Sequence, residues 1–443
     1  MFLEKEGKLI YSYDGETVCI EAWGKDALRV RATKNRSFTG RDWALEAKDA
    51  HAGEVEIFED PSAKGGAFAN MYEGTDTSYG KITNGKLHAV INSGSVITFY
   101  HEDGRVLLKE HFRRLRDEES MPLNIMGREY SNGVGDNFRI VARFVARKGE
   151  KIFGMGQYQQ HELDLKGCML ELAQRNSQVS VPFYLSSIGY GFLWNNPGVG
   201  QVMFANNGTE WVTESGKEID YLVIAGDTPA EIEENYMTLT GKPPMMPEYG
   251  MGFWQCKLRY WNQEQLLSVA RKYKELGVPL DVIVVDFFHW TKQGEFKFDP
   301  KYWPDVPGMC RELKEMGIQV VVSVWPTVDI YSENFEEMKE KGYLVRTEHG
   351  VPLTMLCGGN EVFFDATNPD ARTYVWEKIK KNYYDQGAKL FWLDVAEPEY
   401  SVYDFKNYRY QLGSVQEVGN IYPKYYLKAF YDGMTAEGDT MPI

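Results

Sequence analysis

The chain has 443 residues, of which 43% are hydrophobic and 26% charged, proportions typical of folded proteins and not of disordered ones. Such a length accommodates roughly two to four domains. The 64 acidic residues outnumber the 49 basic residues and give a formal charge of −15, which disfavours phosphate backbones and anionic lipid surfaces as partners. We therefore expect neither a nucleic-acid nor a membrane partner.

The cysteines and the N-terminal residues indicate the cellular compartment in which the protein is expected. The five cysteines are scattered and include no C-x-x-C pair, which predicts free thiols in a reducing environment. The first residues lack the basic and apolar regions of a signal peptide, and no stretch is apolar over the roughly 18 residues that a membrane span requires. The protein is therefore predicted to be cytoplasmic.

Residues 1–225 have the pattern of an all-β domain. Short segments such as TVCIEAW, ALRVRAT and YGFLWNN alternate apolar and polar residues and are separated by Gly, Asp, Asn or Ser. This pattern predicts a β-sandwich or a pair of them. The segment DTPAEIEENYMTLTGKP is the first clear helix, and with the proline-rich residues after it forms a predicted connection over residues 226–246.

Residues 247–443 change to helices that alternate with compact apolar strands. Near-continuous apolar strands of this kind predict a parallel sheet. No glycine-rich phosphate loop follows a strand, so a (β/α)8 barrel is favoured over an open nucleotide-binding sheet. We expect four strands, half of a barrel, and hence an N-terminal fragment that is inactive or unstable alone. Three of the helices are predicted to end at Gly277, Gly317 and Gly387. The four strands are expected around Gly252, Ile283, Val322 and Phe391.

Three of these strands end in acidic or aromatic residues, at the end where barrels carry their chemistry. The ends read VVDFFHW, SVWPTVD and FWLDVAEPEY. Asp394 directly follows an apolar strand, where an ionisable group costs several kcal/mol unless it has a partner or a function. Two ordinary interpretations stay open, in which Asp286 caps the next helix and Trp325 fills the barrel core. Carboxylates beside tryptophans, however, favour sugar chemistry.

The segments GFWQCKLRY, DVIVVDFFHW, SVWPTVD and KLFWLDVAEPE resemble glycoside hydrolase family 31, which contains α-glucosidases and α-xylosidases. The resemblance extends from about Gly154 to the end of the chain. It implies a galactose-mutarotase-like β-sandwich before the barrel and hydrolysis with retention of configuration.

The resemblance also implies roles for individual residues. Asp394 matches the catalytic nucleophile, and Glu397 supports its loop. Asp286 matches the residue that binds hydroxyls of the sugar being cleaved, and Trp325 and Trp392 line the same subsite. The acid/base follows later in the family sequences, so no residue of this chain is assigned to it.

Substrate preference is expected to depend on Phe287 and Phe288, which occupy the place where family members accommodate or exclude the sugar's hydroxymethyl group. Two phenylalanines leave less polar room there, which favours α-xylose over α-glucose and predicts an α-xylosidase, with an α-glucosidase as the alternative. Gln157, in FGMGQYQQHELDLKG, is a candidate for a residue next to the substrate, although a turn with paired glycines explains this segment equally well.

Two other classes of function remain open. Asp286, His289, Asp394 and Glu397 could ligate a divalent cation, although no HxH or HExxH spacing supports this. Alternatively, the chain could bind carbohydrate without turnover. We expect no metal and no cofactor, a small oligosaccharide or α-glycoside as the partner, and leave a homo-oligomer open.

Overall fold

The computed structural model describes residues 1–46, 49–59, 78–111, 113–115, 123–350, 360–398 and 405–439. The chain divides into two compact units, Met1–Pro243 (the N-terminal unit) and Pro244–Ile443 (the C-terminal unit). Within the described ranges, none of the helices combines the length and the apolar character needed to cross a membrane. Cys357 lies outside these ranges, and the other four cysteines form no disulfide.

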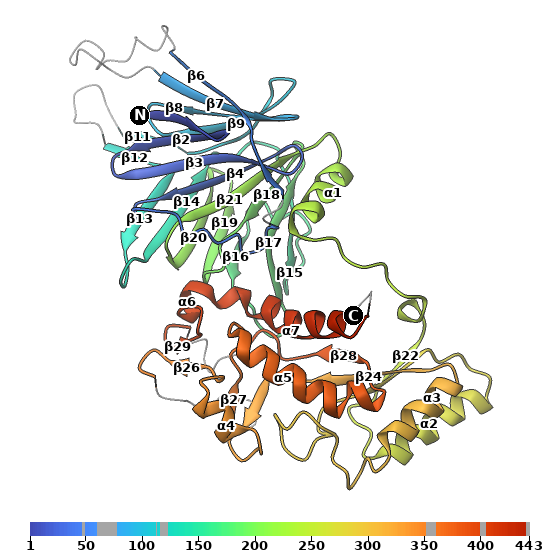
Figure 1. The fold of residues 1–443 in the computed structure, drawn as a ribbon. Helices are drawn as coiled ribbons and strands as arrows, with labels where there is room; N and C mark the ends of the chain where they lie inside the picture. The colour runs from blue at the N-terminus through green and yellow to red at the C-terminus, as the bar shows by residue number, and fades with distance from the viewer. Residues whose placement is uncertain are drawn as a thin grey trace. The chain divides into compact units, whose positions relative to one another are not determined.

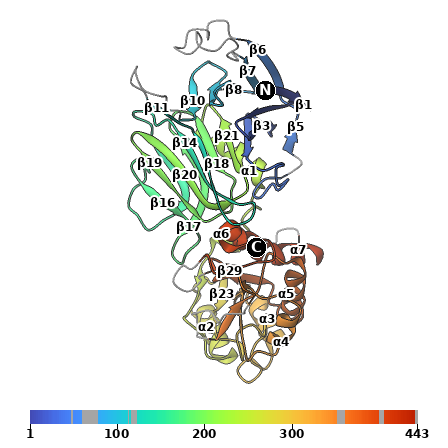
Figure 2. The same cartoon turned by 90° about the vertical axis from the view of Figure 1, so that its left-hand side faces the viewer.

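The N-terminal unit is built mainly from antiparallel strands in three large sheets (Figure 2). The first sheet has the order β1-β2-β3-β4-β21-β18-β17-β15, with β5 paired to β3. Its strands are β1 Phe2–Lys5, β2 Lys8–Tyr13, β3 Glu16–Trp23, β4 Ala27–Thr33, β5 Ala50–His51, β15 Ile152–Gln157, β17 Val179–Ser186, β18 Tyr190–Trp194 and β21 Ile219–Ala225.

The other two large sheets have the orders β10-β9-β8-β7-β6 and β13-β14-β20-β19-β16, and a small hairpin pairs β11 with β12. Their strands are β6 Glu54–Glu59, β7 Ser78–Asn84, β8 Leu87–Asn92, β9 Ile97–His101, β10 Val106–Lys109, β11 Arg113–Leu115, β12 Leu123–Ile125, β13 Arg128–Asn132, β14 Phe138–Phe144, β16 Met169–Leu172, β19 Gly200–Ala205 and β20 Gly208–Gly216.

These strands form because their apolar residues alternate with polar ones. In β8, Leu87, Ala89 and Ile91 are fully buried, whereas the residues between them are half-buried. Side chains from all three large sheets, such as Ile20, Phe99 and Trp211, belong to one hydrophobic core. The predicted β-rich character of this region is confirmed.

Arg128 forms a buried ion-pair network in the N-terminal unit. Its guanidinium group donates hydrogen bonds to both carboxylate oxygens of Glu16, each at 2.9 Å, and to a carboxylate oxygen of Glu110. It also donates to the backbone oxygen of Ser95 at 2.9 Å. Glu16 and Glu110 are therefore each paired with a positive charge and hydrogen-bonded, as buried carboxylates require.

The N-terminal unit ends in α1 (Pro229–Thr240), within the predicted connection. The Thr228 side chain accepts a hydrogen bond from the backbone N–H of Glu231, and Pro229 occupies the first turn. The helix ends at Gly241, whose φ of 107° is readily adopted only by glycine.

The C-terminal unit contains a parallel sheet of four strands in the order β22-β23-β24-β28. Figure 1 labels three of them, β22, β24 and β28. The four predicted strands and their parallel orientation are confirmed. The strands are β22 Trp254–Gln255, β23 Val282–Val285, β24 Gln319–Val324 and β28 Leu390–Leu393. The helices are η3 Glu248–Met251, α2 Gln263–Glu275, α3 Val306–Glu315, α4 Phe335–Glu340, α5 Pro369–Asn382, η4 Tyr384–Gln386, α6 Val415–Val418, η6 Gly419–Ile421 and α7 Tyr422–Ala436.

Glycines end the helical segments that lead into three of these strands, as predicted. Gly277, Gly317 and Gly387 have φ values of 65°, 77° and 102°. Because such values are unfavourable for residues with a Cβ, glycine stops each helix and lets the chain turn back toward the sheet.

Two small antiparallel pairs interrupt the αβ pattern between β24 and α7. They are β25 (Thr327–Asp329) with β27 (Glu361–Phe363), and β26 (Arg346–Thr347) with β29 (Tyr408–Arg409). Their strands have two or three residues, too few to produce a recognisable alternation in the sequence.

Candidate active site

Four residues follow directly after the last residues of the four parallel strands. They are Cys256 after β22, Asp286 after β23, Trp325 after β24 and Asp394 after β28. The register pairs Val285 with Val322 and Val324 with Leu393. The sheet therefore brings these four positions to one edge, the carboxyl edge, at which parallel αβ barrels carry their catalytic groups.

Alternation along the strands places the same residues on one face of the sheet. Leu390 packs with the buried Val282, Val284 and Val321, so these side chains share a face. Trp392 and Asp394 follow Leu390 at intervals of two residues and point the same way, as Asp286 does after Val284. The opposite face meets the helices, as the contact of Phe391 with Phe430 of α7 shows, with ring centroids 5.2 Å apart.

Asp394 is held by two neutral donors. The indole Nε1–H of Trp325 donates to its Oδ2 at 3.1 Å, and the backbone N–H of Val395 donates to its Oδ1 at 2.9 Å. Val395 has a φ of 56°, an outlier for a β-branched residue and a kind of strain concentrated at functional sites. Trp325 is only half-buried and binds the carboxylate, so the interpretation of Trp325 as simple core filling is wrong.

Asp286 is 7% exposed and, within the described ranges, also receives hydrogen bonds from neutral groups only. The backbone N–H of Phe287 donates to its Oδ1 at 2.8 Å, and the Cys256 thiol lies 3.7 Å from its Oδ2. The next long helix, α3, is capped by the side chain of Asp305. The interpretation of Asp286 as a helix cap is therefore wrong.

Cys256 is a contact that the sequence analysis missed. Burial and the neighbouring Asp286 carboxylate raise the pKa of its thiol to about 11, so that the sulfur keeps its hydrogen and can donate it. The available signal was positional, since Cys256 immediately follows the first strand of the sheet.

An aromatic wall links the ends of β23 and β24. The Phe287 ring stacks on Trp325, with centroids 5.2 Å apart and an interplanar angle of 29°. Phe288 contacts Phe287 at 4.6 Å, is 52% exposed and lies beneath the Arg259 guanidinium group, 5.1 Å from the ring centroid. Flat apolar faces beside carboxylates suit the CH faces and hydroxyls of a sugar.

Three more residues were predicted for the site, namely Trp392, Glu397 and Gln157. Trp392 is 42% exposed and lines a hollow with residues of α7. Glu397 is half-buried, three residues after Asp394. Gln157 is an exposed residue at the end of β15 in the N-terminal unit. The glycines before it serve a bulge in β15, because a Cβ on Gly156 would lie 2.1 Å from the Val179 carbonyl oxygen.

The described residues offer no ready metal site. No group of three or more His, Cys, Asp or Glu among them is arranged to hold an ion. Both ring nitrogens of His289 are engaged, Nδ1 with the Asp286 carbonyl oxygen and Nε2 with the Tyr383 hydroxyl, each at 2.9 Å. His289 therefore has no free nitrogen for the cation that the sequence left open.

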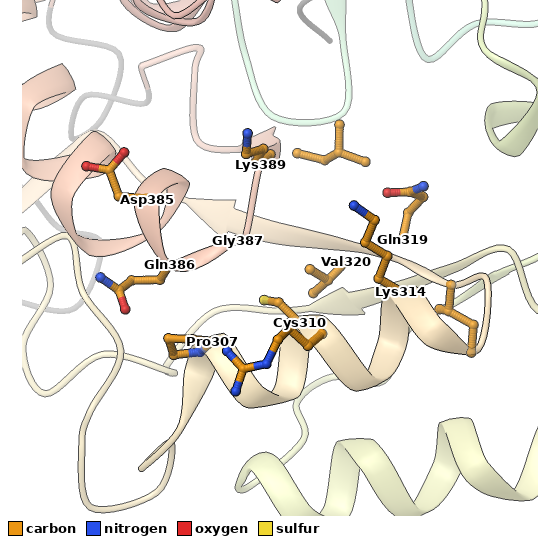
Figure 3. A pocket seen from close by; sticks show the side chains of 12 residues that line it. Pro307, Cys310, Lys314, Gln319, Val320, Asp385, Gln386, Gly387 and Lys389 are labelled. Carbon is orange, nitrogen blue, oxygen red and sulfur yellow. The ribbon is translucent and has the colours of Figure 1, made fainter.

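A separate hollow of about 530 Å³ lies at the opposite edge of the sheet (Figure 3). Gln319 and Leu390, the first residues of β24 and β28, line it together with Cys310, Lys314 and Lys389. Because it lies at the amino ends of the strands, away from Asp286 and Asp394, it is not the candidate active site.

Comparisons with known proteins agree with this geometry. The model of the glycosyl hydrolases family 31 TIM-barrel domain matches residues 243–443. The uncharacterized family 31 glucosidase ORF2 of Pseudescherichia vulneris is 46% identical over 448 residues, which cover 99% of this chain and 81% of that protein. Alpha-xylosidase A of Aspergillus niger is 30% identical over 460 residues, 96% of this chain and 60% of that protein.

A solved structure extends the likeness. The crystal structure of a family 31 α-xylosidase from a soil metagenome, complexed with xylose, matches with a TM-score of 0.92 and 50% identity, covering 100% of this chain and 64% of that chain. The likeness thus begins well before Gly154, where the motifs alone placed it. The chain spans less than two thirds of this α-xylosidase and of the Aspergillus enzyme.

Proposed function

Because the chain belongs to glycosyl hydrolase family 31, we propose that it cleaves terminal α-linked xylose by a retaining mechanism, with Asp394 as the nucleophile. The observation that carries the proposal is the environment of Asp394. Its carboxylate ends a strand of the parallel sheet and is oriented by Trp325 and the Val395 N–H. Among the described residues, no cation pairs with it, so its negative charge remains available to the substrate.

In the proposed first step, a carboxylate oxygen of Asp394 forms a bond to the anomeric carbon of the sugar. The bond from that carbon to the leaving oxygen breaks, and a second carboxylic acid protonates this oxygen. In the second step, water attacks the anomeric carbon and gives a proton to the second residue, which is now a carboxylate. The bond between the anomeric carbon and the Asp394 oxygen breaks, which frees both the sugar and the Asp394 carboxylate. The second acid is proposed to lie outside these 443 residues, as the family resemblance implies, and Glu397 is proposed to support the nucleophile loop.

Asp286 is proposed to accept hydrogen bonds from the sugar's hydroxyls. In the part of the chain that the structure describes, each of its oxygens has one neutral donor, the Phe287 N–H or the Cys256 thiol, which leaves further lone pairs for a ligand. Trp325 and Trp392 are proposed to line the same subsite. Gln157 is proposed to lie next to the substrate.

The preference for xylose rests on Phe287 and Phe288. Xylose lacks the hydroxymethyl group that glucose carries. Two phenylalanine rings at this place would therefore not hinder the binding of xylose but would exclude the larger sugar. The xylose complex of the 50%-identical relative supports this choice. An α-glucosidase is the second candidate, since the relative from Pseudescherichia vulneris is described as a glucosidase.

Several wider features are proposals of the same kind. Residues 1–225 are proposed to form a galactose-mutarotase-like sandwich, residues 226–246 a connection, and residues 247–443 the first half of the catalytic barrel. A cytoplasmic location is proposed as well.

The experiment is covalent labelling of the full-length protein with 5-fluoro-xylosyl fluoride, with 5-fluoro-glucosyl fluoride in a parallel reaction. These reagents trap the glycosyl-enzyme of a retaining glycosidase. We expect peptide mapping to find the label on Asp394, with faster inactivation by the xylosyl reagent. A label on another residue, or a product of inverted configuration by NMR, would overturn the assignment, and faster inactivation by the glucosyl reagent would favour the α-glucosidase.

A further inference from the structure

The turn after β23 adopts a conformation that needs support. Phe288 has a φ of 62°, in the left-handed region that bulky side chains avoid. A conformation of this kind is unfavourable for a residue with a large side chain and persists only when the surroundings impose it. Asp286 lies two residues earlier, so whatever holds this turn also sets the direction of its carboxylate.

The buried side chain of His289 is hydrogen-bonded to the backbone of this turn. Its side chain is 2% exposed, and its Nδ1 lies 2.9 Å from the backbone oxygen of Asp286, three residues earlier in the chain. A carbonyl oxygen can only accept, so Nδ1 must carry the hydrogen. Burial lowers the pKa of His289 to about 4, which keeps the ring neutral and leaves Nε2 as an acceptor.

Tyr383 supplies the donor that this acceptor requires. Its hydroxyl lies 2.9 Å from His289 Nε2, and its side chain is 1% exposed. Burial holds the pKa of the phenol well above its ordinary value, so that the O–H is retained. Tyr383 directly follows α5, and its backbone N–H donates to the Ile379 carbonyl oxygen at 2.9 Å, which anchors it to the helix.

A continuous chain of hydrogen bonds therefore runs from the end of α5 to the turn that carries Asp286. Every donor in it meets one acceptor, and no alternative arrangement of hydrogens satisfies a neutral ring between a hydroxyl and a carbonyl. Helix α5 lies between β27 and β28 in the sequence, and the two side chains are 94 residues apart, so the contact exists only in the fold.

We propose that His289 and Tyr383 are positioning residues that clamp the strained turn after β23 and thereby aim the Asp286 carboxylate at the substrate. This inference rests on the proposed function in one respect, that Asp286 binds the sugar. Neither residue is expected to touch the substrate, since both are almost completely buried.

The test is a double-mutant cycle on the full-length protein with aryl α-xyloside as substrate. His289→Leu removes the clamp and is expected to lower kcat/KM about 100-fold, the loss typical of a misplaced polar group. In an Asp286→Ala background, the same substitution is expected to change kcat/KM by less than about twofold, because no carboxylate remains to be aimed. An equal loss in both backgrounds would show that His289 supports the fold in general and would overturn the proposal.

Two further variants distinguish the effect of the hydrogen bonds of His289 and Tyr383 from the effect of their packing. His289→Asn keeps an N–H within reach of the Asp286 carbonyl oxygen and should restore most of the activity. Tyr383→Phe removes only the hydroxyl and should cost roughly tenfold or less. The matched control is Tyr384→Phe, one residue later, whose hydroxyl bonds Asp439 at 2.7 Å and should leave kcat/KM unchanged. A control loss as large as that of Tyr383→Phe would contradict the clamp.

The imidazole tautomer tests the clamp independently of turnover. Long-range ¹H–¹⁵N correlation spectra should show His289 as the neutral Nδ1–H tautomer between about pH 8 and pH 5. A hydrogen on Nε2, or titration near the ordinary histidine pKa, would overturn the clamp whatever the enzyme does. Conversely, a wild-type protein with this tautomer and no turnover of aryl α-xyloside or α-glucoside counts against the proposed function alone.

Discussion

Two pairs of carboxylates, one pair in each unit, have opposite kinds of partner. In the N-terminal unit, Glu16 and Glu110 are paired with the buried Arg128. Burial alone would raise the pKa of Glu16, but the charge and hydrogen bonds of Arg128 hold it below its ordinary value. In the C-terminal unit, Asp286 and Asp394 have hydrogen bonds from neutral groups and, among the described residues, no cationic partner.

The difference in partners distinguishes carboxylates that stabilise the fold from carboxylates that can bind or attack a substrate. A carboxylate neutralised by an arginine is electrostatically satisfied and offers little to a ligand. A carboxylate oriented by N–H and S–H groups is not neutralised by a cation and keeps several lone pairs for a ligand. The second arrangement is what a nucleophile or a binder of sugar hydroxyls requires, and it occurs here at the carboxyl edge of the parallel sheet.

The largest effect is expected from Asp394→Ala. Removing the proposed nucleophile should lower kcat by about 10⁴-fold or more, because no covalent intermediate can form. The melting temperature should stay within a few degrees of the wild type, since no ion pair is broken. Steady-state assays and thermal unfolding measure the two effects. Asp385→Ala, which alters a carboxylate that pairs with Lys380 on the surface, is the control and should keep full activity.

Arg128→Ala should have the largest effect on stability. It leaves Glu16 and Glu110 in the core without their cation, which typically costs about 3 to 5 kcal/mol of unfolding free energy. Chemical denaturation followed by intrinsic fluorescence would measure the loss. Arg139→Ala is the matched control in the same sheet, because its pair with Glu214 is exposed at both partners and should contribute less than about 1 kcal/mol. Similar losses for the two variants would contradict the structural role assigned to Arg128.

Trp325→Phe tests whether a neutral hydrogen-bond donor orients the Asp394 carboxylate. The substitution keeps an aromatic ring to stack on Phe287 but removes the N–H that binds Asp394 Oδ2. We expect kcat to fall roughly tenfold, the value of one hydrogen bond to a charged group. Trp376→Phe, on α5, is the control and should change kcat little. Unchanged kcat for Trp325→Phe would mean that the indole does not orient the nucleophile.

Glu361 should produce the smallest effect, and one that depends on pH. It lies opposite Asp329 in the β25–β27 pair and is 7% exposed, with one oxygen that has no partner among the described residues. Burial, with a contribution from Asp329, raises its pKa to about 7. The folded protein thus binds this proton more tightly than the unfolded chain does. The stability that this group contributes is therefore fully present at low pH and is lost as the pH rises through 7.

Glu361→Gln keeps the neutral form at every pH. We expect it to be stabilised over the wild type by roughly 1 kcal/mol at pH 8 and by little at pH 5. Denaturation at the two pH values measures this difference, with Glu336→Gln, an exposed residue of α4, as the control. A stability difference that does not change with pH would show that Glu361 is already ionised in the folded protein.

Much of the C-terminal unit could be predicted because its signals are local. The apolar run before Asp394 and the glycines at 277, 317 and 387 depend on residues close together in the sequence. The short pairs β25–β27 and β26–β29 could not be predicted, since strands of two or three residues have no period to detect.

The sequence by itself determined that apolar strands alternate with helices, that the strands run parallel, and that carboxylates and tryptophans stand at their ends. Only the tertiary structure decided which of these groups meet: Trp325 with Asp394, 69 residues apart, Cys256 with Asp286, 30 apart, and His289 with Tyr383, 94 apart. The physical reason is that strand and helix preferences arise within a few neighbouring residues, whereas the partner of a polar group depends on strand register and on which helix packs behind the sheet.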